Sequence, residues 1–303
     1  MTLNLPTRLN RFLARPLGEK RNILAWHVRN LPWHLRRLWH NIPVLKSVEP
    51  GFLFLVWNDV VREAVLSGDF EKAERKFVER FLRPGMTVLD VGSYYGLYAL
   101  TASAKVGKQG LVVAFEPSPP QRRRLRLHLW LNRSRNVRVE ETALSSTNGE
   151  HEFFVATKGS EGFSGLRRPD IGASVRSVRA NLMTLDTYLQ QRSISQVDFI
   201  KVDVEGGELD FFKGAQNLLQ GKMRPVILCE LQNVRARAWG HTALDTATFI
   251  RNLGFSWFRP LADGSLVRVA ASTDEYEGNF VAVPVERTAE VPETTNDESA
   301  APN

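Results

Sequence analysis

The 303-residue chain has a single cysteine, Cys229, which excludes an intramolecular disulfide framework and a zinc site built from several cysteines. It also lacks an apolar run of the roughly 20 residues that a membrane-spanning helix needs. Its longest dense apolar run is the short segment 52-FLFLVW-57. The N-terminus lacks the uninterrupted apolar centre of a signal peptide. We therefore expect a folded cytoplasmic protein, and 43% hydrophobic residues are enough for a large core.

Acidic residues are scarce in the first 50 positions, which contain two acidic and nine basic residues. This segment therefore carries the whole formal net charge of +7. The same segment places Trp26, Trp33 and Trp39 among arginines, a composition that suits the boundary between water and lipid headgroups. Two interpretations stay open: peripheral membrane or glycolipid contact through residues 1–50, or short helices that cover the main domain. We predict three parts: a basic extension over 1–50, one domain over 51–285, and a disordered acidic tail over 286–303.

Strand and helix patterns alternate along the central part of the chain, which predicts an α/β fold with a doubly wound, mostly parallel sheet covered on both faces. Near the C-terminus, an Asp263-Gly264 turn between apolar segments predicts a hairpin, and 278–285 supplies another strand. The apolar runs that predict the parallel strands are 87–91, 111–117, 136–144, 197–204 and 225–231.

The first of these runs leads into the loop 90-DVGSYYG-96, at the edge where such sheets bind ligands. The dinucleotide fingerprint G-x-G-x-x-G, started at Gly92, would need glycines where the chain has Tyr94 and Leu97. A tyrosine at the second glycine position favours a ligand without a pyrophosphate, such as S-adenosylmethionine. Gly92 and Gly96 alone would also be explained by a tight strand-to-helix turn without a ligand.

The second run ends in Glu116, 26 residues after Asp90, near the offset at which an acidic side chain accepts hydrogen bonds from ribose hydroxyls. A nicotinamide-dependent oxidoreductase would use the same acid, so that class stays open. A nucleic-acid methyltransferase would use the basic N-terminus. The chain has no N/D-P-P-Y-type motif and no recognisable recognition module, so we expect no nucleic-acid partner.

Six segments of the chain carry a recognisable pattern: 68–100, 112-VVAFEPSP-119, 142–154, 184-TLDTY-188, 198-DFIKVDVEGGE-208 and 225-PVILCE-230. In the order and spacing of these segments the chain resembles the FkbM family of S-adenosylmethionine-dependent methyltransferases. The resemblance implies a class I methyltransferase (Rossmann-like) fold whose seven-stranded sheet has an antiparallel last strand. It also implies O-methylation of a hydroxyl on a sugar, a glycan or glycolipid, or a natural product.

The chain departs from the family pattern at Ser93 and Tyr94, where the family commonly has Ala-Asn. Tyr94 could cover the methionine part of the cofactor or make a cation–π contact with its sulfonium. It could equally block the site, which would make the protein an inactive homologue. The cofactor-binding residues that we predict are Asp90, Gly92, Tyr94, Gly96, Glu116, Thr142, Ala143 and Asp203.

Methyl transfer requires alignment of the acceptor with the methyl group and removal of a proton from the attacking oxygen. The family's D-V-E-G motif maps onto 203–206, so we predict Asp203 as the base or acceptor anchor, with Glu205 and Glu230 as further catalytic carboxylates. Glu205 and Glu208 could instead favour the N-terminus of the following helix. We predict no metal, because no histidine has a suitable spacing. The arginine-rich segment 157–182 could line the pocket of an anionic acceptor or lie disordered.

Overall fold

A computed structural model describes residues 42–59, 61–157, 160–169 and 174–294. The chain divides into two units, Met1–Val44 and Leu45–Asn303. Most of the predicted N-terminal extension lies outside the described residues. Its last residues belong to strand β1 (Val44–Val48), which pairs with β2 (Phe52–Val56), so regular structure begins before the predicted boundary at residue 51.

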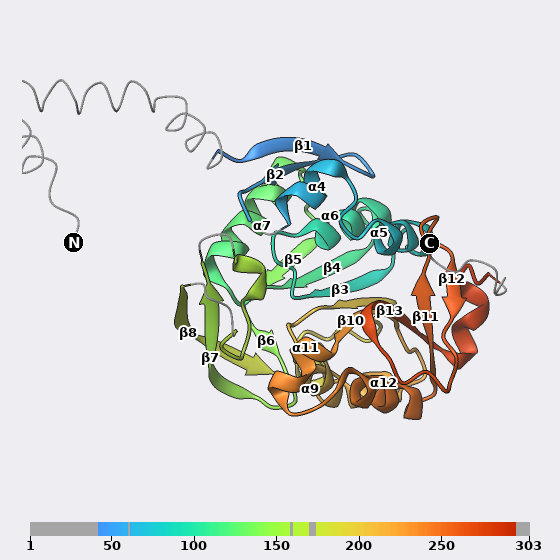
Figure 1. Ribbon diagram of the computed structural model, residues 1–303. Coiled ribbons are helices and arrows are strands. Elements are labelled where there is room, and N and C mark those ends of the chain that lie inside the picture. Colours follow the sequence, from blue (N-terminus) through green and yellow to red (C-terminus); the bar gives the residue numbers. More distant parts are fainter. Residues whose placement is uncertain (1–41, 60, 158–159, 170–173, 295–303) are drawn as a thin grey trace, which may run out of the picture. The chain divides into compact units, whose positions relative to one another are not determined.

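The central sheet has eight strands in the order β12-β11-β13-β10-β9-β3-β4-β5 (Figure 1). The predicted doubly wound, mostly parallel sheet is confirmed, and β13, the last strand in the chain, runs antiparallel to β10. The eighth strand is β12, which follows the predicted turn at Asp263-Gly264 and pairs antiparallel with β11. The strands are β3 (Thr87–Val91), β4 (Leu111–Phe115), β5 (Val137–Glu140), β9 (Phe199–Val202), β10 (Val226–Gln232), β11 (Phe255–Pro260), β12 (Leu266–Arg268) and β13 (Glu277–Pro284).

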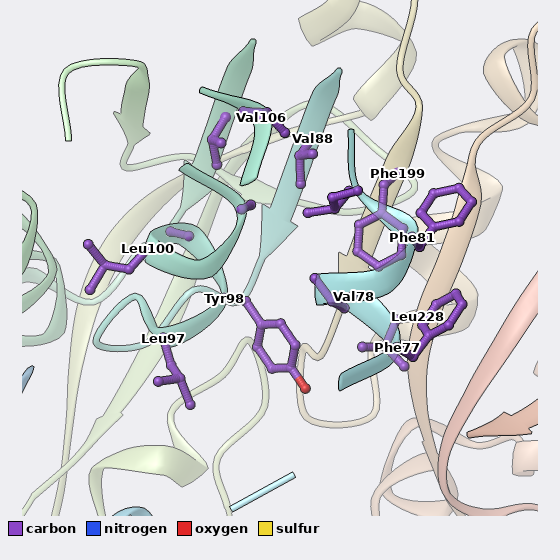
Figure 2. Packing of buried hydrophobic residues seen from close by; sticks show 14 of the residues in the cluster. Phe77, Val78, Phe81, Val88, Leu97, Tyr98, Leu100, Val106, Phe199 and Leu228 are labelled. Atoms are coloured by element: carbon purple, nitrogen blue, oxygen red, sulfur yellow. The ribbon is translucent and has the colours of Figure 1, made fainter. Parts of the chain in front are cut away.

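Helices cover both faces of this sheet, which is why its central parallel strands are buried and mostly apolar. Figure 2 shows Phe77 and Phe81 beside Phe199 of β9, with ring centroids 6.4 and 5.8 Å from that ring. The first face carries α4 (Arg62–Ser67), α5 (Lys72–Phe81), α6 (Leu97–Val106) and α7 (Pro119–Leu131). The second carries α8 (Leu185–Gln191), α9 (Glu208–Lys213), α10 (Gln216–Leu219) and α12 (Ala243–Asn252).

A separate three-stranded sheet has the order β6-β8-β7, with β6 (Ala143–Leu144), β7 (Gly149–Ala156) and β8 (Val175–Met183). We expected 136–144 to be one strand. Instead β5 ends at Glu140, and the chain turns so that β6 can pair in parallel with β8. The segment predicted to line a pocket or lie disordered therefore contributes much of β8 and the 3-10 helix η1 (Glu161–Phe163).

Residues 286–294, which we predicted to belong to a disordered tail, are ordered against the domain. Residues Val285–Glu290 form the 3-10 helix η3, and Val291 is buried. The Leu266 amide donates to the Pro292 carbonyl, and the Thr294 amide donates to the Leu266 carbonyl, both at 2.8 Å. This short stretch is therefore held beside β12 because it buries a valine and completes backbone hydrogen bonds. Residues 295–303 lie outside the described part, and within that part no helix is long and apolar enough to cross a membrane.

Candidate active site

A cavity of about 250 Å³ lies at the carboxyl ends of β3, β4, β9 and β10, the edge at which doubly wound sheets bind ligands. Gly96 does not line it. Gly96 has φ of 88°, and a Cβ there would lie 2.2 Å from Leu125 Cδ1, so the turn before α6 and its contact with α7 both favour a glycine. The other predicted site residues all line the cavity: Asp90, Gly92, Tyr94, Glu116, Thr142, Ala143, Asp203, Glu205 and Glu230.

The loop after β3 fits tightly between two strand ends. Gly92 has φ of 80°, and a Cβ built on it would lie only 1.8 Å from the carbonyl oxygen of Asp203. The amides of Gly92 and Ser93 both donate to the Phe115 carbonyl, at 3.1 and 3.0 Å. The glycine is thus required by the close approach of β9, and the loop is fixed to the end of β4.

Glu116 supports the same loop from the end of β4. One carboxylate oxygen accepts a hydrogen bond from the backbone N–H of Tyr94 and the other from that of Ser118, both at 2.8 Å. Burial raises the pKa of Glu116 to about 8. Each oxygen retains acceptor capacity beyond its single backbone bond, so the side chain can also receive hydroxyl donors from a ligand in the cavity.

Asp90 is a buried carboxylate that faces the cavity. The Ser93 hydroxyl donates to the backbone carbonyl of Asp90, and within the described residues neither carboxylate oxygen has a hydrogen-bond partner. Burial raises its pKa to about 6. Because an unpaired buried carboxylate is unfavourable, this position suits a cationic group on a ligand. The ammonium of S-adenosylmethionine meets that requirement, and the ribose of the same molecule suits Glu116.

Tyr94 forms part of the cavity wall rather than filling the cavity. Its φ is 52°, its hydroxyl donates to Asp59 Oδ2 at 3.3 Å, and its ring stacks on Tyr95 with centroids 3.7 Å apart. Burial raises the pKa of the phenol, which keeps the hydroxyl a neutral donor. The ring is therefore held in place, with an aromatic surface bordering the cavity.

The turn after β9 carries two of the predicted carboxylates. Glu205 has φ of 57° and Gly206 φ of 96°, and one Glu208 carboxylate oxygen accepts the amides of Val204 and Gly206 at 3.0 and 3.2 Å. The Trp239 indole N–H donates to the Glu205 carbonyl at 3.1 Å. Glu208 therefore serves to shape the turn, which leaves Asp203 and Glu205 facing the cavity.

The three predicted catalytic carboxylates have different partners. Asp203 Oδ2 lies 2.8 Å from Lys201 Nζ, and Glu205 Oε2 lies 3.0 Å from Arg235 Nε. Glu230 Oε1 accepts only the neutral amide of Gln232, at 2.9 Å, among the contacts described. Burial, followed by the neighbouring Asp203, raises the pKa of both Glu205 and Glu230. Of these three carboxylates, Glu230 is thus the one without a cationic partner in the described structure.

Sequence reasoning missed the cation at the centre of this group. Lys201 is 5% exposed, and its Nζ lies 5.3 Å from the Tyr98 ring centroid. Burial alone would lower the pKa of Lys201, but the nearby carboxylates of Asp203 and Glu71 raise it by more than burial lowers it. The ammonium therefore stays charged. A lysine inside the apolar run 197-VDFIKVDV-204 was the available signal, because lysine is seldom buried without a counter-charge.

The outer wall of the cavity was also not identified from the sequence. Phe163 of η1 and Trp239 of the 3-10 helix η2 (Arg237–Trp239), which follows α11 (Asn233–Ala236), contribute aromatic rings. The Arg235 guanidinium lies 4.6 Å from the Phe163 ring centroid. Within the described residues, no group of three or more His, Cys, Asp or Glu side chains is arranged to hold a metal ion.

Comparison with known proteins gives a family match over most of this region. The family model described as "Methyltransferase FkbM domain" matches residues 90–257, which is more than half of the chain. The curated relative AMB antimetabolite synthetase AmbE of Pseudomonas aeruginosa is 26% identical over 207 residues. That alignment covers 57% of this chain but only 10% of AmbE, so the chain corresponds to a small part of that relative.

Two solved structures are similar at low sequence identity. Methyltransferase FkbM from Methylobacillus flagellatus is 15% identical, with a TM-score of 0.41, and the match covers 86% of this chain and 60% of that one. An O-methyltransferase from Bacillus cereus in complex with SAH is 16% identical, with a TM-score of 0.37 and coverage of 72% and 80%.

Proposed function

The chain belongs to the FkbM methyltransferase family and is an S-adenosylmethionine-dependent methyltransferase, and on this premise we propose that it methylates a hydroxyl oxygen. Family membership overturns the alternative of a nicotinamide-dependent oxidoreductase. The proposed acceptor class is a sugar, a glycan or glycolipid, or a natural product. When bound, the cofactor supplies an electrophilic methyl group next to a positively charged sulfur.

The observation that carries the proposal is a cluster of three carboxylates at one end of the cavity. Asp203, Glu205 and Glu230 project from two adjacent strand ends, in register through the Cys229 and Val202 pair. An alcohol needs a proton acceptor as its oxygen attacks, and a carboxylate of raised pKa is suited to that task near neutral pH. These carboxylates therefore support a hydroxyl as the acceptor group.

Among these groups we favour Glu230 as the base and Asp203 as the group that anchors the acceptor. A proton on Asp203 would remove the counter-charge nearest to the buried Lys201 ammonium, which makes Asp203 a costly place for the proton. A proton on Glu230 breaks no ion pair of the described structure and relieves the repulsion from Asp203. The sequence instead favoured Asp203 as the base, with Glu230 as a further catalytic carboxylate.

The outer wall supports a carbohydrate acceptor with an anionic group. The rings of Phe163 and Trp239 can pack against the apolar face of a sugar, while Glu205 and Arg235 offer paired acceptors and donors. The Arg167 guanidinium lies 5.9 Å from the Trp239 ring centroid and can add a second positive charge beside the first. Arginine pairs of this kind favour carboxylate or phosphate groups.

Two conservative variants separate the roles. Glu230→Gln should lower kcat by roughly 10²- to 10⁴-fold, because it removes the proton acceptor and keeps its shape. Asp203→Asn should mainly raise KM for the acceptor. The wild-type kcat should rise with pH as Glu230 ionises, and this rise should be absent in Glu230→Gln. If Asp203→Asn instead abolishes the pH dependence, Asp203 is the base.

The acceptor class is tested with glycolipid and polysaccharide extracts from a strain that lacks the gene, incubated with the purified protein and isotopically labelled cofactor. Mass spectrometry of the hydrolysed sugars should find the labelled methyl group on an oxygen. Label on a nitrogen or carbon atom, or in added RNA alone, would contradict the proposal.

A further inference from the structure

We propose that the outward side of α7 is a docking surface for an anionic lipid bilayer. One side of this helix and the turn after it presents exposed residues at i, i+3, i+4, i+7 and i+10. Trp130 is 73% exposed, an unusual position for the largest apolar side chain. The basic-aromatic face consists of Arg123, Arg126, Leu127, Trp130 and Arg133, together with Leu53 of β2.

The other side of α7 is packed into the protein, so the outward side is free to serve another role. Leu125, His128 and Leu129 are buried. Arg122 donates to the Glu116 and Pro117 carbonyls and pairs with Glu141. These contacts fix the helix and engage Arg122 within the fold.

Arg124 is also engaged within the fold, in this case by aromatic rings, since its guanidinium lies 4.7 Å from the ring centroids of both Trp57 and Tyr95. Arg123, Arg126 and Arg133 are different: within the described residues none of them forms a salt bridge. The three exposed arginines therefore have charge available for an external partner.

Leu53 extends the face from a neighbouring element. Its amide donates to Asn132 Oδ1, and Asn132 Nδ2 donates back to its carbonyl, both at 2.7 Å. The adjacent Phe54 ring stacks on His128 with centroids 4.0 Å apart. Strand and helix are thus joined by hydrogen bonds and stacking, so Leu53 and the exposed residues of α7 form one preorganised surface.

The charges and apolar groups together identify the partner. No acidic residue occurs between positions 119 and 139. Arginines attract anionic headgroups, while tryptophan and leucine side chains gain by entering the boundary between headgroups and acyl chains. A polyanion such as RNA would pair with the arginines but leave the two leucines without a suitable contact. In a symmetric dimer of this face, arginines would meet arginines.

The sequence before β1 has the same chemistry, since it carries the whole net positive charge of the chain and three tryptophans among arginines. A single weak site seldom anchors a protein to a bilayer, and two signals together do so more firmly. The proposal does not depend on the identity of the methyl acceptor, because its test measures binding and not turnover.

The test is co-sedimentation of the full-length protein with vesicles of phosphatidylcholine, with and without phosphatidylglycerol. The wild type should bind the vesicles that contain phosphatidylglycerol and release them as salt rises. The double variant Arg123→Gln, Arg126→Gln should bind about 25-fold more weakly, at about fivefold per basic residue. Trp130→Ser should weaken binding without changing its salt dependence.

The matched control removes two exposed lysines on other elements, Lys108→Gln with Lys222→Gln, and should change vesicle binding less than twofold because electrostatic attraction falls off within a Debye length. Unchanged cofactor affinity verifies that each variant is folded. Equal binding of the arginine variant and the wild type would overturn the proposal, since the N-terminal segment alone would then bind the lipid. Equal binding to neutral vesicles, a dimer that Trp130→Ser dissociates, or a preference for RNA over lipid would also overturn it.

Discussion

Replacement of Gly92 by alanine should destabilise the protein more than an equivalent change at Gly85, and the difference isolates one packing constraint of the site. Both glycines have φ near 80 to 90°. A Cβ at Gly85 meets no atom within 4 Å, whereas a Cβ at Gly92 would lie 1.8 Å from the Asp203 carbonyl oxygen. The pair therefore shares the backbone strain and differs in the clash.

The magnitudes follow from these two contributions. A left-handed conformation of a non-glycine residue costs about 1 to 2 kcal/mol, which applies to both variants. Overpacking of a well-packed site adds about 1 to 3 kcal/mol, which applies to Gly92→Ala alone. For a domain of this size, each 1 kcal/mol lowers Tm by roughly 2 to 4 °C. We expect a loss of about 2 to 8 °C for Gly85→Ala and about 4 to 20 °C for Gly92→Ala.

Thermal unfolding and titration calorimetry with S-adenosylmethionine measure the two effects. Gly85→Ala should bind the cofactor like the wild type. Gly92→Ala should bind it at least about tenfold more weakly, because relief of the clash separates the loop from Asp203 at the cavity wall. Equal Tm losses in the two variants would refute the argument, since they would show that the ends of β3 and β9 have room for a methyl group.

Four further outcomes are expected. Glu116→Gln should weaken cofactor binding roughly ten- to a hundredfold by calorimetry. Burial raises the pKa of Glu116 from 4.5 to about 8, so protonated Glu116 stabilises the fold below about pH 4.5, and this contribution is lost as the pH rises to about 8. The free energy of unfolding should therefore fall by up to roughly 1.4 kcal/mol per pH unit across this range. Urea unfolding of Glu116→Gln at several pH values should lack this part of the pH dependence. Lys201→Met should lower the free energy of unfolding by up to about 3 kcal/mol, and the double change with Asp203→Asn should restore part of it. Calorimetry of the wild type in buffers of different ionisation enthalpy should detect proton release on cofactor binding, which Glu230→Gln should reduce.

The sheet and one side of the cavity could be predicted from the sequence because both follow from local patterns. A buried parallel strand is a continuous apolar run, so the positions after Val91, Phe115 and Val202 could be placed at one edge of the sheet. Parallel strands share that edge, which brings Glu116 and Asp203 to the same cavity without further information.

The outer wall of the cavity depends on contacts between residues far apart in the sequence, which no local sequence pattern indicates. Phe163 and Trp239 lie in short 3-10 helices without periodicity, and their placement follows from the second sheet and from the turn at Gly206. The strands β7 and β8 were not predicted, because their exposed sides are polar and because they pair with each other and not with a strand of the central sheet. The partners of the carboxylates were missed for the same reason, since Arg235 is 30 residues from Glu205 in the chain.

The ionic composition of the cavity accounts for the kind of ligand that it suits. Its lining contains seven carboxylates and, among the described residues, two cationic side chains, Lys201 and Arg235; the carboxylates are those of Glu71, Asp90, Glu116, Glu161, Asp203, Glu205 and Glu230. Low-dielectric walls strengthen the mutual repulsion of the carboxylates, which is why burial and Asp203 raise the pKa of Glu230. A ligand that carries an ammonium and a sulfonium offsets this excess of negative charge, so it favours the ionised form of the proposed base. The preference for a cationic cofactor and the readiness of Glu230 to accept a proton are then consequences of one arrangement of charges at the ends of β9 and β10.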